Sequence, residues 1–431
     1  MTLTPWGRAD ELRMRQLPPG PSKDRVAVER NQRERLMGAT VAAVAELGYE
    51  ATRVADVLEL AGVSRNAFYA HFDNKQECFL ATLDAVATMA GAAVLDRYRN
   101  AEGAWHERLA AAFELMAEMV VAQPAAARLG LVEVYAAGPE ALERLEAIDR
   151  RVEKTVLEAL SESPERVAMP REIVRAILGG LRKIMHTRVR EGREAELPGL
   201  VPELLEWALT YRSPPQRLRR PRKPPAELVA KRPEADDGWR RMLYAVTELV
   251  AEKGYPAMTI TEIAEGAGVS LTTFYAYFSG KEEAFLATLA DAQERLLSAT
   301  LPIFKAAKDW PHGVSAGLHA FFAFLATDAT TARLGVMAVW ATGPRGLDLR
   351  ARGMAAFSAL LDEGYRNYPE TKRAAGEAIG ASIDALLYDY LRRKGADRIY
   401  EIAPTAAFIA LAPFVGSEAA AEVANAKPAL G

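Results

Sequence analysis

Hydrophobic residues recur at helical spacing along most of the chain, and this pattern predicts an all-α protein. A long helix is expected from Arg25 to the glycine at position 48, which is typical of a helix end. One face of this helix carries the apolar residues Leu36, Ala39, Ala43, Val44 and Leu47. Further helices are predicted over residues 105–121, 125–136, 138–160, 171–190 and 202–211.

The chain contains an internal repeat. The stretch AGVSRNAFYAHFDNKQECFLATL at 61–83 returns as AGVSLTTFYAYFSGKEEAFLATL at 267–289. More than half of the positions are identical when 46–83 is compared with 252–289 without gaps. The later landmarks ARLG at 127–130 and 332–335 recur at an offset one residue shorter. The duplication therefore continues beyond this stretch, with a one-residue length change in a loop.

Each copy is typical of two short helices joined by a tight turn. In the first copy Gly62 is free to take a positive φ at the turn, and Ser64 stands where the next helix needs an N-cap. Phe68 and Phe72, four residues apart, share one face and are expected to pack inward. The remaining positions of this short helix are polar or phenolic, as in a recognition helix that enters the major groove.

The motif AGVSxxxFYxxFxxKxExF resembles the helix-turn-helix of the TetR family of ligand-responsive transcriptional regulators. The resemblance implies a DNA-binding head, a connecting helix that begins at 74–75 or 280–281, and a helical effector-binding body in each unit. It also implies base contacts at the start of each recognition helix and phosphate contacts around it. At the start of the second head helix, Thr259 matches the threonine typical of the family, whereas Arg53 departs from it and could bond a phosphate directly. The candidate DNA contacts are Arg53, Ser64, Arg65, Asn66, Tyr69, His71, Lys75, Thr259, Thr261, Ser270, Thr272, Thr273, Tyr275, Tyr277 and Lys281.

The two predicted heads differ at the positions that would read bases. Arg65-Asn66-Ala67 is replaced by Leu271-Thr272-Thr273, and His71 by Tyr277. We expect the heads to read different half-sites, with the second head the weaker reader. The second helix of each head also starts differently: Thr259 and the glutamate three residues later form a capping-box pattern, which Arg53 does not offer.

The charge distribution adds a basic linker to this picture. The net charge is −3, and neither head is basic: residues 23–83 hold eight basic and nine acidic residues, and residues 239–289 four and six. Residues 211–233 hold eight basic residues and one acid. Because this stretch is rich in proline, we expect an extended, solvated tether, with a DNA-binding arm as the less favoured alternative.

These observations divide the chain into seven segments. The boundaries are 1–22 for a flexible N-terminal arm, 23–83 for head 1, 84–212 for body 1, 213–237 for the linker, 238–289 for head 2, 290–416 for body 2 and 417–431 for a frayed tail.

Bulky apolar residues in both bodies are interpreted as core or as the lining of a pocket for an unknown small apolar effector, which the family resemblance implies. The candidate effector contacts are Trp105, Phe113, Met116, Tyr135, His319, Phe322, Met337 and Trp340.

Apolar stripes on the late helices extend the family comparison. In the family, the last two helices pair between subunits, so here they are expected to make a single-chain pseudo-dimer, with a homo-oligomer as a further option. The stripes are Ile173, Ile177, Leu181 and Ile184 in the first unit and Ile379, Ile383, Leu386 and Tyr390 in the second.

The composition and the absence of certain motifs narrow the classes of protein to which this chain can belong. A single cysteine rules out a disulfide framework, and the N-terminus does not read as a signal peptide. No apolar run approaching a membrane span is apparent, so no membrane partner and a cytoplasmic location are expected. No metal-ligand pattern, cofactor loop or catalytic motif stands out, so no metal, cofactor or enzymatic activity is predicted.

The sequence thus predicts a regulator that binds double-stranded DNA and responds to an effector, with repression as the expected sign. Two alternatives stay open. One is a small-molecule sequestering protein with degenerate heads, favoured by the acidic balance of head 2 and opposed by Ser270, Tyr275 and Lys281. The other is a constitutive DNA-binding protein without an effector.

Overall fold

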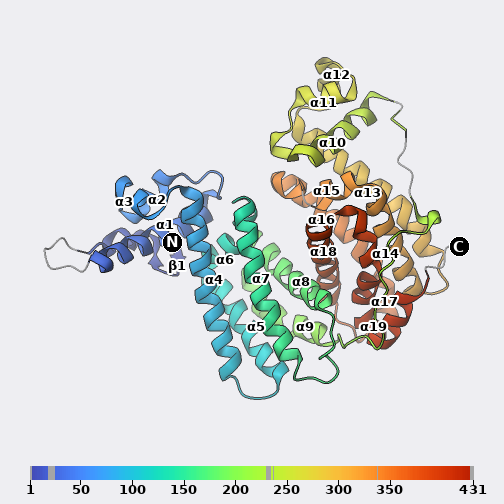
Figure 1. Ribbon diagram of the computed structural model, residues 1–431, viewed down its shortest axis with the longest axis horizontal. Coiled ribbons are helices and arrows are strands. Elements are labelled where there is room, and N and C mark those ends of the chain that lie inside the picture. Colours follow the sequence, from blue (N-terminus) through green and yellow to red (C-terminus); the bar gives the residue numbers. More distant parts are fainter. Residues whose placement is uncertain (1, 18–24, 230–233, 236, 337, 428–431) are drawn as a thin grey trace. The chain divides into compact units, whose positions relative to one another are not determined.

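A computed structural model describes residues 2–17, 25–229, 234–235, 237–336 and 338–427 (Figure 1). The described residues are predominantly helical, and their only sheet is the antiparallel pair β1 (Leu3–Thr4) and β2 (Gly7–Arg8). The prediction of an all-α protein is confirmed. The chain forms two compact units, unit 1 from residues 1–167 and 182–205 and unit 2 from residues 168–181 and 206–431.

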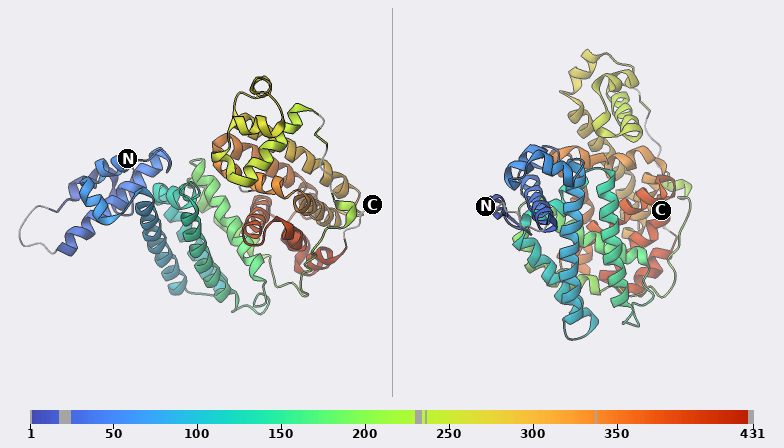
Figure 2. Two further views of the ribbon diagram at one scale, coloured as in Figure 1. Left: turned by 45° about the horizontal axis from the view of Figure 1, so that its top comes forward. Right: turned by 60° about the vertical axis from the view of Figure 1, so that its left-hand side comes forward.

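Unit 1 contains the first head and most of the first body. In Figures 1 and 2, the three head helices gather at one end of α4, and the body helices lie along its length. Its helices are α1 (Arg25–Leu47), α2 (Val54–Ala61), α3 (Arg65–His71), α4 (Lys75–Asn100), α5 (Trp105–Ala122), α6 (Pro124–Leu131), η3 (Glu133–Tyr135), α7 (Pro139–Leu160), η4 (Glu194–Glu196), the second half of α8 (Arg171–Arg190) and most of α9 (Leu197–Leu209).

The apolar face of α1 builds the head as its spacing predicts. Leu36, Ala39, Ala43 and Val44 are buried, whereas Leu47 at the helix end is exposed. The head core also takes in the inward side chains of α2 and α3.

The N-terminal segment differs from the expected flexible arm. Residues 3–8 form the hairpin, and η1 (Ala9–Glu11) and η2 (Arg13–Arg15) follow it. Leu12 is fully buried in the core of head 1, and the Thr4 hydroxyl donates to the Gly7 carbonyl at 2.7 Å. One apolar anchor and a two-residue hairpin give too short a pattern to stand out in the sequence. The rest of the predicted arm, 18–22, lies outside the described residues.

Unit 2 repeats the arrangement of a head at one end of a long helix. Here α10, α11 and α12 gather at the end of α13 (Figures 1 and 2). The elements are the first half of α8, η5 (Ala226–Leu228), α10 (Gly238–Ala257), α11 (Ile260–Ala267), α12 (Leu271–Tyr277), α13 (Lys281–Lys305), α14 (Trp310–Thr327), α15 (Ala329–Val336), η6 (Ala338–Ala341), α16 (Gly343–Ala359), α17 (Asp362–Asn367), α18 (Ala374–Lys394), η7 (Ala396–Ile402) and α19 (Ala403–Asn425).

Within unit 2, the first half of α8 packs closely against α18. The Arg175 guanidinium lies 3.1 Å from the Asp389 carboxylate. A Cβ added at Gly180 would stand 2.9 Å from the Ser382 backbone nitrogen, so the missing side chain permits the close approach. The buried stripe residues Ile173 and Ile379 belong to these two helices.

Residues 217–219 of the linker and residues 417–425 of the predicted tail are held in place by hydrogen bonds and helical structure, which differs from the expected tether and frayed end. The Asn425 amide accepts from the Arg219 N–H at 2.7 Å and donates to the Arg217 carbonyl at 3.2 Å. Leu218 is buried, and the Ser417 hydroxyl accepts from the Arg212 N–H at 2.9 Å. The tail is helical because α19 continues through a bend at Gly416 to residue 425. The high proline content of this linker therefore did not imply that residues 217–219 are a free, solvated tether.

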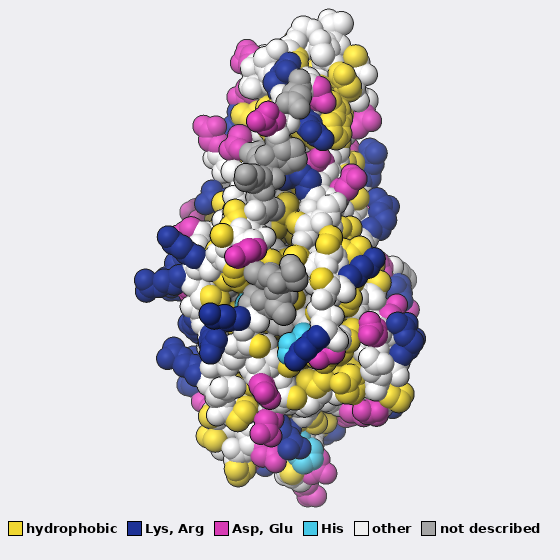
Figure 3. All heavy atoms as spheres, turned by 90° about the vertical axis from the view of Figure 1, so that its right-hand side faces the viewer, with side chains coloured by type: hydrophobic (Ala, Val, Ile, Leu, Met, Phe, Trp, Pro, Cys, Tyr) yellow, Lys and Arg dark blue, Asp and Glu magenta, His cyan; other side chains and the backbone are white. Residues whose placement is uncertain are grey.

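The positive charge of the linker is partly neutralised. Arg220 forms an ion pair with Glu172 within unit 2, while Arg219 and Arg222 are exposed. Figure 3 shows one face of the molecule, where Lys and Arg side chains are interspersed with Asp and Glu.

Some helices among the described residues pass a length and hydropathy test for membrane spans. They are residues 75–100 and 396–425, and a bent pair from 105 to 135 would bring the total to three. The expectation that no apolar run approaches this length overlooked alanine-rich helices with few charges. The apolar window in 396–425 is 83% buried inside the fold, as in a core helix, whereas that in α4 is 28% buried.

Candidate nucleic-acid interface

The turn between the two helices of each head depends on a glycine. Gly62 has φ +60° and Gly268 has φ +62°, a left-handed conformation that other residues rarely adopt. The Gly62 N–H closes α2 by donating to the Leu58 carbonyl at 2.9 Å. A Cβ at Gly62 would lie 2.5 Å from Arg13 Cγ, so the turn also makes room for the N-terminal segment.

Each recognition helix begins at a serine cap. The Ser64 hydroxyl accepts from the Ala67 N–H at 3.2 Å, and the Ser270 hydroxyl accepts from the Thr273 N–H at 3.0 Å. These caps fix the first turn of α3 and α12, which each have only seven residues. Both hydroxyls are exposed, and their contact with DNA stays a prediction.

The helices before the turn, α2 and α11, are capped in related ways. At α11, Thr259 and Glu262 form the predicted capping box, and hydrogen bonds from Lys253 and then Thr259 lower the pKa of Glu262 to about 2. At α2, the Asp56 carboxylate accepts from the Arg53 N–H at 2.7 Å, so half of the box is present where none was expected. The Arg53 and Thr261 side chains are exposed.

The recognition helices separate core and surface side chains cleanly. Phe68, Phe72, Phe274 and Phe278 are buried, as the spacing predicts. The side chains expected to face DNA stand in solvent, with exposed fractions of 50% for Tyr69, 57% for Tyr275 and 52% for Tyr277. Arg65, Asn66 and Thr272 are also exposed, and Thr273 is half-buried with its hydroxyl 2.9 Å from Ser270 Oγ.

His71 lies apart from the other candidate contacts. Its Nε2 is 3.2 Å from the Gln32 amide oxygen, and the ring is half-buried. Burial, and then the nearby Arg33 charge, lower the pKa of His71. The imidazole is therefore neutral near pH 7 and would meet a phosphate as a hydrogen-bonding group rather than as a cation.

The lysines at 75 and 281 fasten the corner between the first two helices of their heads. The Lys75 ammonium donates to the carbonyls of Tyr49, Glu50 and Thr52 at 2.8, 3.3 and 2.9 Å. It also lies 4.3 Å from the centre of the Tyr49 ring. An ammonium has three donors, so all are used inside the protein. Burial lowers the pKa of Lys75.

Lys281 makes the matching contacts in head 2. It donates to the carbonyls of Tyr255, Pro256 and Met258 at 3.4, 3.0 and 3.1 Å. Both lysines were expected to bind DNA phosphates, but their ammonium groups donate to backbone carbonyls instead. We therefore assign Lys75 and Lys281 to stabilising the corner between the first two head helices.

A carboxylate that the sequence analysis did not single out joins body 1 to the same corner. Glu133, at the start of η3, is buried and accepts from the Tyr49 N–H at 2.9 Å. Its other oxygen lies 3.2 Å from the Arg128 guanidinium. The sequence offered one signal for a special role of Glu133. When the two repeats are aligned, the equivalent position in repeat 2 is Ala338, so the carboxylate is present in repeat 1 alone.

The candidate effector residues of body 1 are partly accessible. Trp105, Phe113, Met116 and Tyr135 are all half-buried. The Tyr135 hydroxyl accepts from Arg182 at 2.5 Å, and the same guanidinium lies 3.5 Å from the Asp149 carboxylate.

The candidate effector residues of body 2 lie in a tighter core. Phe322 is fully buried, and His319 is 3% exposed with Nδ1 2.8 Å from the Tyr400 hydroxyl. His319 Nε2 is buried without a hydrogen-bond partner, and burial lowers the pKa of His319 to about 4. Met337 lies outside the described residues, as does the side chain of Trp340.

No group of three or more His, Cys, Asp or Glu side chains in the described part of the chain is placed to hold a metal ion.

Comparison with known proteins agrees with this geometry. A family model described as "Bacterial regulatory proteins, tetR family" matches residues 36–82 and again residues 243–288. The HTH-type transcriptional activator FasR of Mycolicibacterium smegmatis is 30% identical over 158 residues, which are 36% of this chain and 72% of FasR. The HTH-type transcriptional regulator EthR of the same organism is 28% identical over 109 residues, a quarter of this chain and half of EthR.

Among solved structures, the fatty acid degradation regulator FadR from Bacillus halodurans matches with 19% identity and a TM-score of 0.38. The match covers 42% of this chain and 97% of that one.

The two heads, the family model and the two sequence relatives define a tandem helix-turn-helix protein that binds DNA and regulates transcription. The chain belongs to the tetR family of bacterial regulatory proteins, and it carries the family's DNA-binding unit twice.

Replacing Lys75 with Met separates its two possible roles. We expect head 1 to lose about 1–3 kcal/mol of stability, because three carbonyls lose their donor. DNA affinity should fall with little change in its salt dependence, since no phosphate contact is removed. Urea unfolding and DNA binding over a salt series check this, with the exposed Lys154→Met as control. Unchanged stability with a salt slope smaller by about one would assign Lys75 to a phosphate instead.

The buried His319 predicts acid sensitivity of unit 2. Its pKa is about 4 in the fold against 6.5 in the unfolded chain, so the unfolded state binds the proton more readily. The stabilisation is complete above pH 6.5 and is lost as the pH falls toward 4, by about 3 kcal/mol in all. Urea unfolding at pH 7.5 and 5 should show about 2 kcal/mol of this loss, and His319→Gln should reduce it while the exposed His106→Gln does not. Equal pH sensitivity of all three proteins would contradict it.

Proposed function

We propose that the protein is an effector-responsive transcriptional repressor whose single chain binds an operator with two unlike half-sites. The observation that carries this proposal is the difference between the two exposed helix starts. Arg65 and Asn66 offer a guanidinium and an amide, which suit purine edges, whereas Leu271 and Thr272 offer methyl and hydroxyl groups. Two identical heads would favour a palindromic operator. Because these two heads present different side chains, we expect them to bind different base sequences.

The packing of α8 against α18 within unit 2 supports a single-chain pseudo-dimer. It places helices from both sequence repeats in one compact unit, which two separate subunits would otherwise supply. A mass near 47 kDa in solution would agree with a monomer, whereas twice that mass would show a homodimer of the tandem chain. The proposed site of action is the cytoplasm, where bacterial DNA is found.

Body 1 is the better candidate to receive an apolar effector. Only three residues of α5 are buried, Ala112, Ala117 and Val120, whereas most of α14 is buried in body 2. Effector binding would then favour one of two head arrangements through unequal affinity for them. Trp105, Phe113, Met116 and Tyr135 are the proposed contacts, and His319 and Phe322 are assigned to the core of body 2.

Footprinting on the DNA upstream of the protein's own gene tests the unlike half-sites. Asn66→Ala should reduce protection mainly over one half and Thr272→Ala mainly over the other, each by a loss of about 1–3 kcal/mol in binding. Asn100→Ala, which removes an exposed amide far along α4, is the control. Equal loss over both halves would contradict unlike readout, and a wild type that binds no DNA at any salt concentration would favour the sequestering protein.

Activation is the second candidate for the sign of regulation. The printed name of FasR, which is 30% identical over 158 residues, is that of an activator. A promoter fusion in cells with and without the protein decides between the two, because a repressor lowers and an activator raises the reporter output.

A further inference from the structure

We propose that the two repeats control their heads unequally, and that η3 transmits the state of body 1 to head 1 through a buried carboxylate. The corresponding η6 packs against head 2 through Ala338 and Val339, which carry no carboxylate. This inference rests on the proposed effector response and names the residues that would carry it. Tyr135 and Glu133 are the positioning residues, one on each side of this single turn.

The first step is the contact between body 1 and head 1. Glu133 holds the Tyr49 N–H at 2.9 Å, and this amide belongs to the same corner that Lys75 fastens through the Tyr49 carbonyl. One peptide segment is thus held from α4 on one side and from the body on the other. Because the carboxylate is buried and charged, its hydrogen bond is stronger than a neutral one.

The second step is the contact between η3 and the interior of body 1. Tyr135 ends the same three-residue turn and receives a hydrogen bond from Arg182 on α8. The Tyr135 ring also meets the His186 ring edge to face, with centroids 5.8 Å apart. A molecule that displaces the Tyr135 hydroxyl from Arg182 would therefore move a turn too short to absorb the shift, and Glu133 would move with it.

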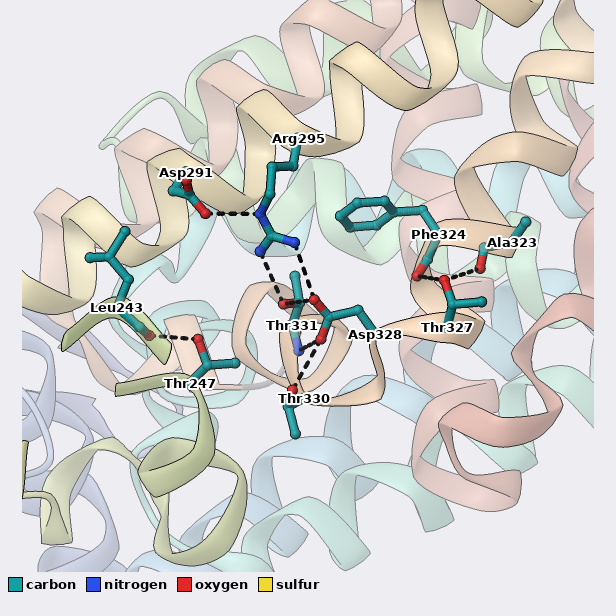
Figure 4. A network of polar contacts seen from close by, with 10 residues as sticks. All are labelled: Leu243, Thr247, Asp291, Arg295, Ala323, Phe324, Thr327, Asp328, Thr330 and Thr331. Atoms are coloured by element: carbon teal, nitrogen blue, oxygen red, sulfur yellow. Dashed lines mark hydrogen bonds and ion pairs between the residues drawn. The ribbon is translucent and has the colours of Figure 1, made fainter. Parts of the chain in front are cut away.

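The third step is that repeat 2 has different residues at both positions, with Ala338 in place of Glu133 and Trp340 in place of Tyr135. Ala338 corresponds to Glu133, so η6 offers no carboxylate from this position to the corner of head 2. The helix before η6 is instead fixed at its other end (Figure 4). Arg295 of α13 lies 2.8 Å from Asp291 and 3.2 Å from Asp328, and Asp328 caps α15 by accepting from the Thr331 N–H at 3.1 Å.

Repeat 1 has none of these charged partners. The positions that correspond to Asp291, Arg295, Asp328 and Thr331 are Ala85, Met89, Gln123 and Ala126. In repeat 2 the polar network joins two helices of the body to each other, whereas in repeat 1 the buried carboxylate joins the body to the head. The structure therefore assigns the responsive role to head 1 and a constant anchoring role to head 2.

Hydrogen exchange on the full chain, without DNA or effector, tests the transmission. Glu133→Ala should speed exchange in the peptide covering 48–52 about tenfold or more, and Glu133→Gln should restore part of the protection. Tyr135→Phe, which alters only the body side, should also speed exchange at 48–52 while leaving 254–258 unchanged. Tyr98→Phe is the matched control, because it removes another hydroxyl of body 1 that receives an arginine bond, from Arg108 at 3.4 Å.

The outcomes separate this inference from the proposed function. An unchanged 48–52 peptide in Tyr135→Phe, or equal acceleration at 254–258, would overturn the inference. Footprinting adds a second readout, in which Glu133→Ala should alter protection of the half-site read by Asn66 and not that read by Thr272. If the wild type binds no DNA, the repressor proposal fails, but the exchange result still decides whether η3 connects body 1 to head 1.

Discussion

Each head depends on one lysine ammonium group that donates hydrogen bonds to three backbone carbonyls, and we call this set of contacts the lysine clasp. Lys75 and Lys281 stand at the first residue of the long helix that leaves the head, and each holds the corner between the first two head helices. The corner sets the angle at which the second helix starts, and the glycine turn then sets the third. The lysine contacts and the buried phenylalanines of α3 and α12 together fix the direction of the exposed side chains on these helices.

The two repeats keep this clasp and vary what surrounds it. The buried phenylalanines, the left-handed glycines and the serine caps are common to both heads. The differing residues at the recognition-helix starts are exposed, whereas core differences such as Val57 to Ile263 and Cys78 to Ala284 keep small or apolar side chains. Physical constraint explains this division, because a changed core residue costs packing in its own head, whereas a changed surface residue costs little stability.

Much of this could be predicted from the sequence, and the exceptions have identifiable causes. Helical periodicity and the duplicated motif determine the heads, because their packing is local and repeats every three to four residues. The order of the N-terminal segment depends on single long-range contacts, such as Leu12 in the head core, which no periodicity announces. The linker was misjudged for the same reason, since its partner Asn425 is about two hundred residues away. The role of Glu133 needed coordinates, because a lone glutamate after a helix has no distinctive pattern.

The fastening of the linker by Asn425 has a consequence during synthesis. Residues 217–219 leave the ribosome about 10–40 s before Asn425 does, at the usual 5–20 residues per second. The first half of α8 is likewise synthesised well before α18, against which it packs. Until α18 is made, Ile173 lacks part of the packing that buries it in the complete fold. Head 1 needs no such delay, since its core comes from residues 12–78. A nascent chain can therefore hold one completed DNA-reading head well before the segments that join the two repeats have met.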